Sequence, residues 1–291
     1  MSGMEKTKKM KKESYFGSIL KRLAKNKLAM AAAIIFILLI LTAILSPLIS
    51  PYSYTAMDLT CKNAGPSLAH PFGTDKLGRD IFSRILYGGR YSMSAGILAV
   101  MGQMVLGIFF GSIAGFFGGK VDEVIMRVLD IIQSIPSTIL MIAVATALGN
   151  GYINTVIALS ISNFPQSARL LRSKMLATRE EEYVTAAELV GCSRVRQIVS
   201  HVLPNSWQPL IVAATMGIAA NILQLASLSY IGLGIQPPIP EWGAMLSGAR
   251  EFIRTYPYQL IFPGLAIALT VLVLNLMGDG LRDALDPRLK D

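Results

Sequence analysis

The sequence predicts an all-α, polytopic membrane protein with six transmembrane helices. Hydrophobic residues make up 53% of the 291 residues and charged residues only 15%, whereas a soluble protein of this size carries about 25% charge. A membrane-spanning helix needs roughly 20 consecutive apolar residues. Five stretches of the chain contain no charged residue and are long enough to span: 28–50, 91–119, 131–168, 202–240 and 255–278.

The third stretch is long enough for two crossings, because Gly149-Asn150-Gly151-Tyr152 supplies a turn near its middle. Pro165 is expected to end the second of these crossings, which is the fourth span. The first span, 28–50, could be misread as a secretory signal. Its apolar core is longer than that of a signal peptide, and the chain stays apolar afterwards, so we interpret it as an uncleaved helix.

Basic residues predict which ends of the spans face the cytoplasm. The net charge is +9, and Lys and Arg are concentrated near the N-terminus. Because basic residues gather on cytoplasmic flanks, both termini and the charged loop are expected inside. The basic charge therefore reflects the topology of the spans, with contact to anionic lipid of the bilayer as an additional use, and nucleic acid is not an expected partner. The predicted units are a basic tail with a lead-in helix (1–27), the first span (28–50), an external segment (51–90), a membrane core (91–285) with a cytoplasmic loop (169–208), and a C-terminal tail (286–291).

The external segment contains HPFGTDKLGRDIFSRILYGGR at residues 70–90. This sequence predicts a turn followed by a helix whose first turn is capped by Thr74 or Asp75. Arg79, Arg84 and Arg90 are expected on wetter faces of that segment. Two interpretations remain open at this point: a structural collar that packs on the outer helix ends, or a contact surface for an extracellular partner.

The second span carries Gly107-x-x-x-Gly111-x-x-x-Gly115, which puts three small residues on one face and permits close approach of another helix. Polar residues at membrane depth either form hydrogen bonds between helices or line a passage for a polar solute. No charged residue lies near the middle of a span, which argues against a proton- or sodium-coupled carrier. The polar residues in question are Gln133, Asn163, Asn221, Gln224 and Asn275.

The cytoplasmic loop predicts a short helix over Arg179–Val190. Thr178 followed three residues later by Glu181 fits a capping box, and Gly191 is well placed to end the helix in a left-handed conformation. Ser193 is expected to cap a second helix that leads to Pro204.

Small side chains on one face of the first loop helix would allow its backbone to approach a neighbour closely. Tyr183, Ala186, Ala187 and Val190 share that face at helical spacing. The face either enters a groove on a partner protein or packs on the chain's own helix ends.

The loop resembles the EAA loop of ABC-importer permease subunits. Its Thr185-Ala186-Ala187 is followed after three residues by Gly191, and Leu203-Pro204 closes the pattern at the family's spacing. Thr185 stands where glutamate is usual, and His201 stands where isoleucine is usual.

Two further motifs resemble the dipeptide/oligopeptide/nickel branch of that family. The external motif is similar to the branch's signature at Gly73, Thr74, Asp75, Gly78, Arg79 and Asp80. The sequence GDGLRDALDPR at residues 278–288 is similar to the C-terminal tail of the second, C-type permease of the pair.

The resemblance implies a type I ABC-importer architecture and a set of partners: a sibling permease, two cytoplasmic ATPases and an external solute-binding protein. It also implies that the loop couples the chain to the ATPases. This chain has no G-x-x-x-x-G-K-[ST] loop, so ATP and Mg²⁺ are expected in the partners, and the chain itself is expected to be neither an enzyme nor a binder of cofactor or metal. The implied coupling residues are Tyr183, Thr185, Ala186, Ala187, Glu188, Gly191, Leu203 and Pro204.

The favoured function implied by the resemblance is therefore import of di- or oligopeptides across a bacterial plasma membrane, and three alternatives remain. A nickel or metal-chelate importer belongs to the same family. A secondary carrier or channel would need no ATPase. An intramembrane hydrolase would need a catalytic pair, and only Asp279 and Asp130, at the inner edges of different spans, come near that requirement.

Overall fold

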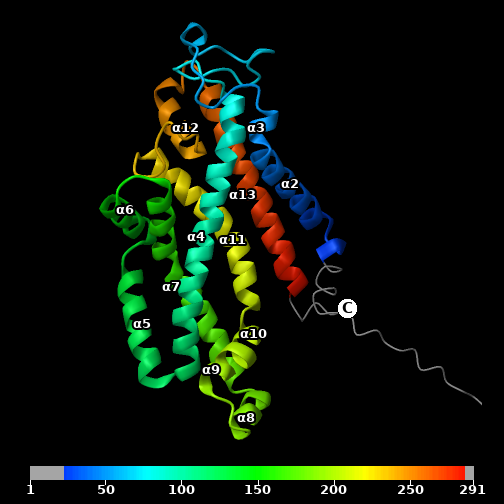
Figure 1. Ribbon diagram of the computed structural model, residues 1–291, viewed down its shortest axis with the longest axis vertical. Coiled ribbons are helices and arrows are strands. Elements are labelled where there is room, and N and C mark those ends of the chain that lie inside the picture. Colours follow the sequence, from blue (N-terminus) through cyan, green and yellow to red (C-terminus); the bar gives the residue numbers. More distant parts are fainter. Residues whose placement is uncertain (1–22, 286–291) are drawn as a thin grey trace, which may run out of the picture.

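The computed structural model describes residues 23–285 and shows an elongated bundle of helices (Figure 1). Within this range there is no strand, only one isolated bridge between Thr74 and Asp80. The all-α prediction is thus confirmed. Most of the predicted basic tail and lead-in helix, and the whole C-terminal tail, lie outside the described residues.

The helices are named here in chain order. They are α2 (Lys27–Ile44), α3 (Ser46–Ile49), η1 (Leu59–Cys61), α4 (Ile81–Phe117), α5 (Gly119–Ser134), α6 (Ser137–Leu148), α7 (Tyr152–Arg179), α8 (Glu182–Leu189), α9 (Arg194–Arg196), η2 (Gln197–Val202), α10 (Leu203–Ser206), α11 (Gln208–Tyr230), α12 (Trp242–Ala249), η3 (Arg250–Phe252) and α13 (Tyr258–Leu285).

Among the described helices, α2, α4, α11 and α13 are long and apolar enough to cross a membrane. The pair α5 and α6 makes a fifth candidate, but it is bent by 87° at a short break. The break falls at Pro136, which lies between the two helices and has no N–H to continue a helix. The count of six spans is not confirmed, because α7 is not apolar enough to be among these candidates and the α5–α6 pair is not one straight helix.

The long helices alternate in direction, so the loops gather at two ends of the bundle (Figure 1). One end carries α8 and is called the α8 end. The opposite end carries the segment 50–80 and α12 and is called the α12 end. Helix α4 packs along α7 and also contacts α11, while α13 packs between α11 and α2.

Helix α7 continues through Pro165 to Arg179. The expectation that Pro165 ends the fourth span was therefore wrong. A proline inside a membrane helix is tolerated where neighbouring groups satisfy the freed backbone. Pro165 is buried in the bundle, and its helix packs closely against α4 over much of its length.

The predicted glycine face of α4 is the contact surface for α7. A Cβ atom on Gly107 would lie 2.6 Å from Ser167 Cβ, and one on Gly111 would lie 2.6 Å from the carbonyl oxygen of Ala168. Hydrogen bonds cross the same seam, including one from Gln103 Nε2 to Ser167 Oγ at 2.8 Å. The absence of side chains on this face lets the two backbones approach each other, as the sequence predicts.

Glu241 connects α12 to α4. Its carboxylate accepts hydrogen bonds from the backbone N–H groups of Gly243 and Ala244 at the start of α12, and from the hydroxyl of Ser92 on α4. The side chain is completely buried. Burial raises the pKa of Glu241, and the hydrogen-bond donors around it act in the opposite direction. The position of α12 therefore depends on these donors.

We expect Glu241→Ala to lower the free energy of unfolding by about 1–3 kcal/mol, because it removes a helix cap and leaves buried donors without acceptors. The measurement is the thermal unfolding midpoint of the purified protein. Glu251→Ala is the matched control, since Glu251 is exposed just after α12. Equal midpoints for the two variants would contradict the structural role of Glu241.

Candidate functional site

Helix α8 lies at the far tip of the α8 end, beyond the ends of the long helices (Figure 1). It begins at Glu182, so the predicted helix over Arg179–Val190 was wrong at its start. The predicted capping box does not form either. The Thr178 hydroxyl donates instead to the carbonyl of Lys174 within α7, and Glu181, at the N-cap position, makes no capping hydrogen bond through its side chain.

The C-terminal end of α8 agrees with the prediction. Gly191 has a φ of 82°, in the left-handed region. Its N–H donates to the carbonyl of Glu188 at 2.9 Å, and the N–H of Cys192 donates to that of Ala187 at 3.0 Å. This pair of bonds is the Schellman arrangement. The predicted second helix consists of three short consecutive helices, α9, η2 and α10, which begin at Arg194 and include Pro204. Ser193 is their N-cap residue, but its side chain makes no capping hydrogen bond.

Only one side of α8 packs on the rest of the chain. Val184 is 4% exposed and belongs to a cluster of buried residues from α7, η2 and α11. Tyr183 is 42% exposed and Val190 is 84% exposed, and Ala186 is exposed too. Three residues of the predicted face are thus exposed, whereas its fourth residue, Ala187, is partly buried. We call Tyr183, Ala186, Leu189 and Val190 the α8 surface.

The remaining predicted coupling residues lie on or near α8. Thr185 and Glu188 are exposed on the helix, whereas Ala187 is partly buried. Leu203, partly buried, packs against the same cluster as Val184, and Pro204 is exposed in the first turn of α10. The loop motif therefore places the exposed helix α8, and the apolar cluster against which Val184 and Leu203 pack, at the same tip of the molecule.

Three of the five predicted polar residues meet inside the bundle. Asn163 Nδ2 on α7 donates to Asn221 Oδ1 at 3.0 Å and to Gln224 Oε1 at 2.8 Å, both on α11. Asn221 is 1% exposed, and its own amide nitrogen has no hydrogen-bond partner among residues 23–285. The three side chains line a cavity of about 440 Å³ between α7 and α11. We call this group the amide cluster.

Gln133 and Asn275 do not line that cavity. Gln133 is exposed near the end of α5, and Asn275 lies partly buried on α13. The cavity is lined in addition by Gln103, Gln166 and Ser167, which are not among the predicted polar residues. Gln103 precedes the glycine face of α4 by one turn, and that spacing is the signal that could have identified it.

The predicted cap of α4 was also wrong. Asp80 is the N-cap residue, and its carboxylate accepts from the N–H of Ser83 at 2.7 Å and contacts His70 Nδ1 at 2.9 Å. Thr74 is buried in the preceding turn, where its hydroxyl accepts from the N–H of Ala64 and donates to the carbonyl of Cys61. Asp75 accepts from backbone N–H groups of the same turn. The helix begins after the motif rather than within it.

The motif packs on the start of α13, as the collar interpretation describes. Phe72 stacks on Phe262 with ring centroids 4.0 Å apart, and Gln259 Nε2 donates to the carbonyl of Thr74 at 3.1 Å. Gly78 has a φ of 71°, and a Cβ there would lie 1.7 Å from the carbonyl oxygen of Asp58. Only glycine fits at this position.

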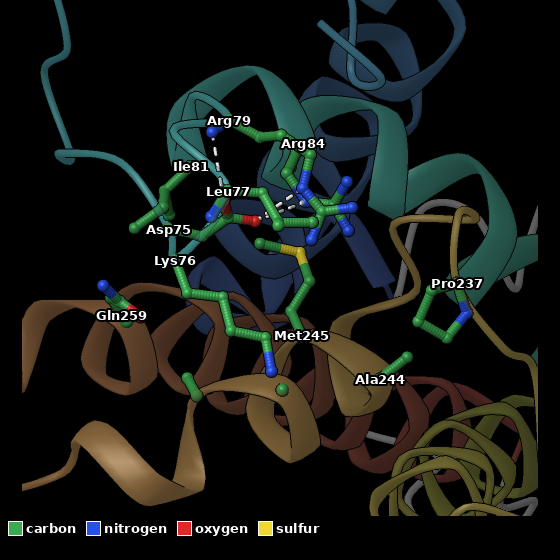
Figure 2. Close-up of a pocket in the computed structure, with 12 residues that line it drawn as sticks. Asp75, Lys76, Leu77, Arg79, Ile81, Arg84, Pro237, Ala244, Met245 and Gln259 are labelled. Carbon is green, nitrogen blue, oxygen red and sulfur yellow. Dashed lines mark hydrogen bonds and ion pairs between the residues drawn. The ribbon is translucent and has the colours of Figure 1, made fainter. Parts of the chain in front are cut away.

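Arg84 is buried, with 3% of its surface exposed, so the expectation of a wetter face was wrong. Figure 2 shows its guanidinium near the side chains of Asp75 and Met245. Arg84 Nη1 donates to the carbonyl of Tyr54 at 2.9 Å, which attaches the segment before the motif to α4. The same expectation was wrong for Arg79, which is 9% exposed and donates from Nε to Asp75 Oδ2 at 2.7 Å, whereas Arg90 is exposed.

Two family profiles match the sequence. The profile described as binding-protein-dependent transport system inner membrane component matches residues 107–291. The profile described as the N-terminal transmembrane domain of oligopeptide transport permease C matches residues 14–69.

Similar curated proteins include a dipeptide transport system permease protein of Alkalihalophilus pseudofirmus. It is 47% identical over 270 residues, which cover 93% of this chain and 89% of that protein. A glutathione transport system permease protein of Pectobacterium atrosepticum is 44% identical over 271 residues, covering 93% of this chain and 90% of that protein.

Solved structures share the fold at low sequence identity. A chain of the inward-facing MetNI methionine ABC transporter matches with a TM-score of 0.55 and 15% identity, covering 70% of this chain and 97% of that chain. A chain of an amino acid ABC transporter matches with a TM-score of 0.50 and 16% identity, covering 72% of this chain and 95% of that chain.

Proposed function

The chain belongs to the family of binding-protein-dependent transport system inner membrane components, and we propose that it forms half of the translocation pathway of an ATP-driven importer of short peptides. The observation that carries this proposal is its similarity along 93% of its length to permeases named for dipeptide and glutathione transport. The same names favour peptides over nickel or metal chelates as the solute. Dependence on a binding protein favours an ABC importer over a secondary carrier.

In the proposed orientation the α8 end faces the cytoplasm and the α12 end faces outward. The tip at α8 then meets one of two ATPase subunits, and a sibling permease completes the pathway. The α8 surface supports this role because its apolar side chains are exposed and its small Ala186 allows the helix backbone to enter a cleft. Closure of the ATPases would move α8 together with the ends of α7 and α11, against which Val184 packs.

The amide cluster is the proposed contact for the solute inside the membrane. Side-chain amides donate and accept hydrogen bonds as peptide groups do, so they suit the neutral backbone shared by all peptides. The buried amide nitrogen of Asn221 has no partner in the described chain, and a carbonyl oxygen of a passing peptide would satisfy it. The cluster also contains no charge that would select particular side chains.

The test is uptake of a labelled dipeptide into proteoliposomes that contain this chain, its sibling permease and both ATPases, with the binding protein outside. We expect uptake to require ATP and the binding protein and to persist when ion gradients are dissipated. Uptake driven by an ion gradient without ATP would overturn the proposal. A crosslinker at Ala187→Cys, in a background with Cys61 and Cys192 replaced by serine, is expected to capture an ATPase subunit.

Glu188 is proposed to replace the glutamate that Thr185 lacks. It is exposed one turn after Thr185, so its carboxylate is free to pair with a basic group of the ATPase. We expect Glu188→Ala to reduce peptide-stimulated ATP hydrolysis about twofold to fivefold, as for a solvent-exposed ion pair. Glu182→Ala, at the opposite end of α8, is the control. Unchanged stimulation in Glu188→Ala would remove Glu188 from the contact.

A further inference from the structure

A second cavity lies at the α12 end, between the external motif and α12 (Figure 2). Its volume is about 270 Å³. Lys76, Arg79 and Arg84 line it on one side, and Ala244 and Gly248 of α12 line it on the other. The cavity is separate from the amide cluster, which lies between α7 and α11.

Positive charge exceeds negative charge in this cavity. Asp75 is the one carboxylate in its lining, against three basic side chains. Its Oδ2 lies 2.7 Å from Arg79 Nε and 3.9 Å from Arg84 Nε, so two guanidinium groups share one carboxylate oxygen. The nearby Asp80 does not contribute, because it caps α4 and contacts His70.

The two arginines are fixed in place by burial. Their exposed fractions are 9% for Arg79 and 3% for Arg84. A buried cation is costly unless it is paired, and the Arg84 guanidinium donates from Nη1 to the carbonyl of Tyr54. Both residues line the cavity, so an anion that enters it would meet their basic side chains. Lys76, which is exposed, extends along the same cavity in Figure 2.

We propose that this cavity binds a carboxylate group. The planar fork of an arginine side chain matches the two oxygens of a carboxylate, and two such forks are already held next to each other. The opposite wall, formed by Ala244, Met245 and Ala249, is apolar and leaves room for the carbon chain that carries the carboxylate. In the proposed orientation the cavity opens on the outer side, where a solute is delivered.

Two sources could supply the carboxylate: the C-terminus of a peptide solute, or an acidic side chain of the solute-binding protein. Only the choice between these sources rests on the proposed function. Binding of a small carboxylate to the cavity does not rest on the proposed function, so the first experiment is independent of peptide transport.

The first experiment measures protection of a thiol introduced by Gly248→Cys. Gly248 lines the cavity, and a Cβ there meets no atom within 4 Å, so the substitution fits without strain. The complete importer in nanodiscs is alkylated with neutral iodoacetamide at constant ionic strength, and labelling at this position is followed by mass spectrometry. We expect N-acetylglycine to slow labelling and its neutral analogue N-acetylglycinamide to leave the rate unchanged.

Charge variants test whether the basic side chains cause the protection. Lys76→Gln is expected to raise the concentration needed for half-protection roughly threefold, as for one accessible ion pair. Lys62→Gln is the matched control, because Lys62 is exposed in the same segment but does not line the cavity. Arg84→Gln is expected to raise it more than about tenfold. If Arg84→Gln fails to fold, the Lys76 and Lys62 pair decides the result.

Equal protection by the carboxylate and the amide, or equal behaviour of Lys76→Gln and Lys62→Gln, would overturn the proposal. Such a failure would leave the proposed function intact, because dipeptide uptake is measured separately.

The source is identified with Gly248→Leu, which fills the cavity without changing charge. Gly264→Leu on α13 is the control, since a Cβ there also meets no atom within 4 Å. If the solute supplies the carboxylate, Gly248→Leu reduces uptake of a dipeptide several-fold more than uptake of its C-terminal amide. If the binding protein supplies it, the variant weakens docking of that protein equally with both peptides. Unchanged uptake and unchanged docking together would exclude both sources and overturn the proposal.

Discussion

Gly111→Leu is expected to prevent the chain from accumulating as a folded membrane protein. The nearest atom to a Cβ at this position is the backbone carbonyl oxygen of Ala168, at 2.6 Å, and the next is Leu171 Cβ at 3.1 Å. A backbone atom cannot move aside as a flexible side chain can, so α4 and α7 would have to separate along their contact. Overpacking typically costs about 1–3 kcal/mol, and we expect a cost at or above the upper end of that range.

The measurement is the amount of chain that survives detergent extraction and size-exclusion chromatography, which we expect to fall at least tenfold, as roughly 1.4 kcal/mol or more would produce. Gly264→Leu is again the matched control, because it adds the same side chain to a helix position with open space. Gly111→Ala should give an intermediate yield. A normal yield of Gly111→Leu would mean that the close contact between α4 and α7 does not exist.

Ala186→Glu is expected to abolish ATP-dependent uptake while the chain accumulates normally. Ala186 is exposed in the middle of α8, so a longer side chain meets nothing in this protein, and glutamate is a good helix former. If α8 enters a cleft of the ATPase, a bulky charged group at its centre would be buried without a partner. A central interface position of this kind is worth about 2 kcal/mol or more, which predicts at least a tenfold loss of uptake.

Ala177→Glu separates this effect from the added charge itself. Ala177 is exposed near the end of α7, at the same end of the molecule as α8 but not on it. We expect Ala177→Glu to keep most of the uptake. Similar uptake by the two variants would show that α8 does not enter a cleft, and ATPase coupling would then have to be sought elsewhere on the α8 end.

Local patterns accounted for the predictions that the structure confirms. The left-handed end of α8 at Gly191 and the close approach at Gly107 and Gly111 depend on the absence of a side chain, which is visible in the residue itself. The predicted helix caps at Thr178 and Thr74 did not form, because a cap depends on where a side chain that is present makes its hydrogen bond. Thr178 and Thr74 have side chains that suit a cap, but their hydroxyls bond to other backbone groups, and a cap motif does not reveal which acceptor is nearer.

The positions of charged and polar side chains in the fold were predicted less well than the positions of the apolar helices. Arg84 was expected in a wet position because arginine is rarely buried, yet it is enclosed by residues from three separate segments: the turn at 75–79, the carbonyl of Tyr54, and α12. Similarly, the five polar residues looked equivalent in the sequence, and only three of them meet.

The sequence by itself determined that this chain is a helical membrane protein of the peptide-permease type with one exposed helix between its spans. Apolar length, charge distribution and motif spacing are properties of neighbouring residues, so they need no knowledge of the fold. Only the tertiary structure decided which amides form a cluster, which face of α8 stays open, and that Arg79 and Arg84 share Asp75. Each of these depends on the packing of side chains from different helices or turns of the chain, and the geometry of that packing is absent from any local pattern.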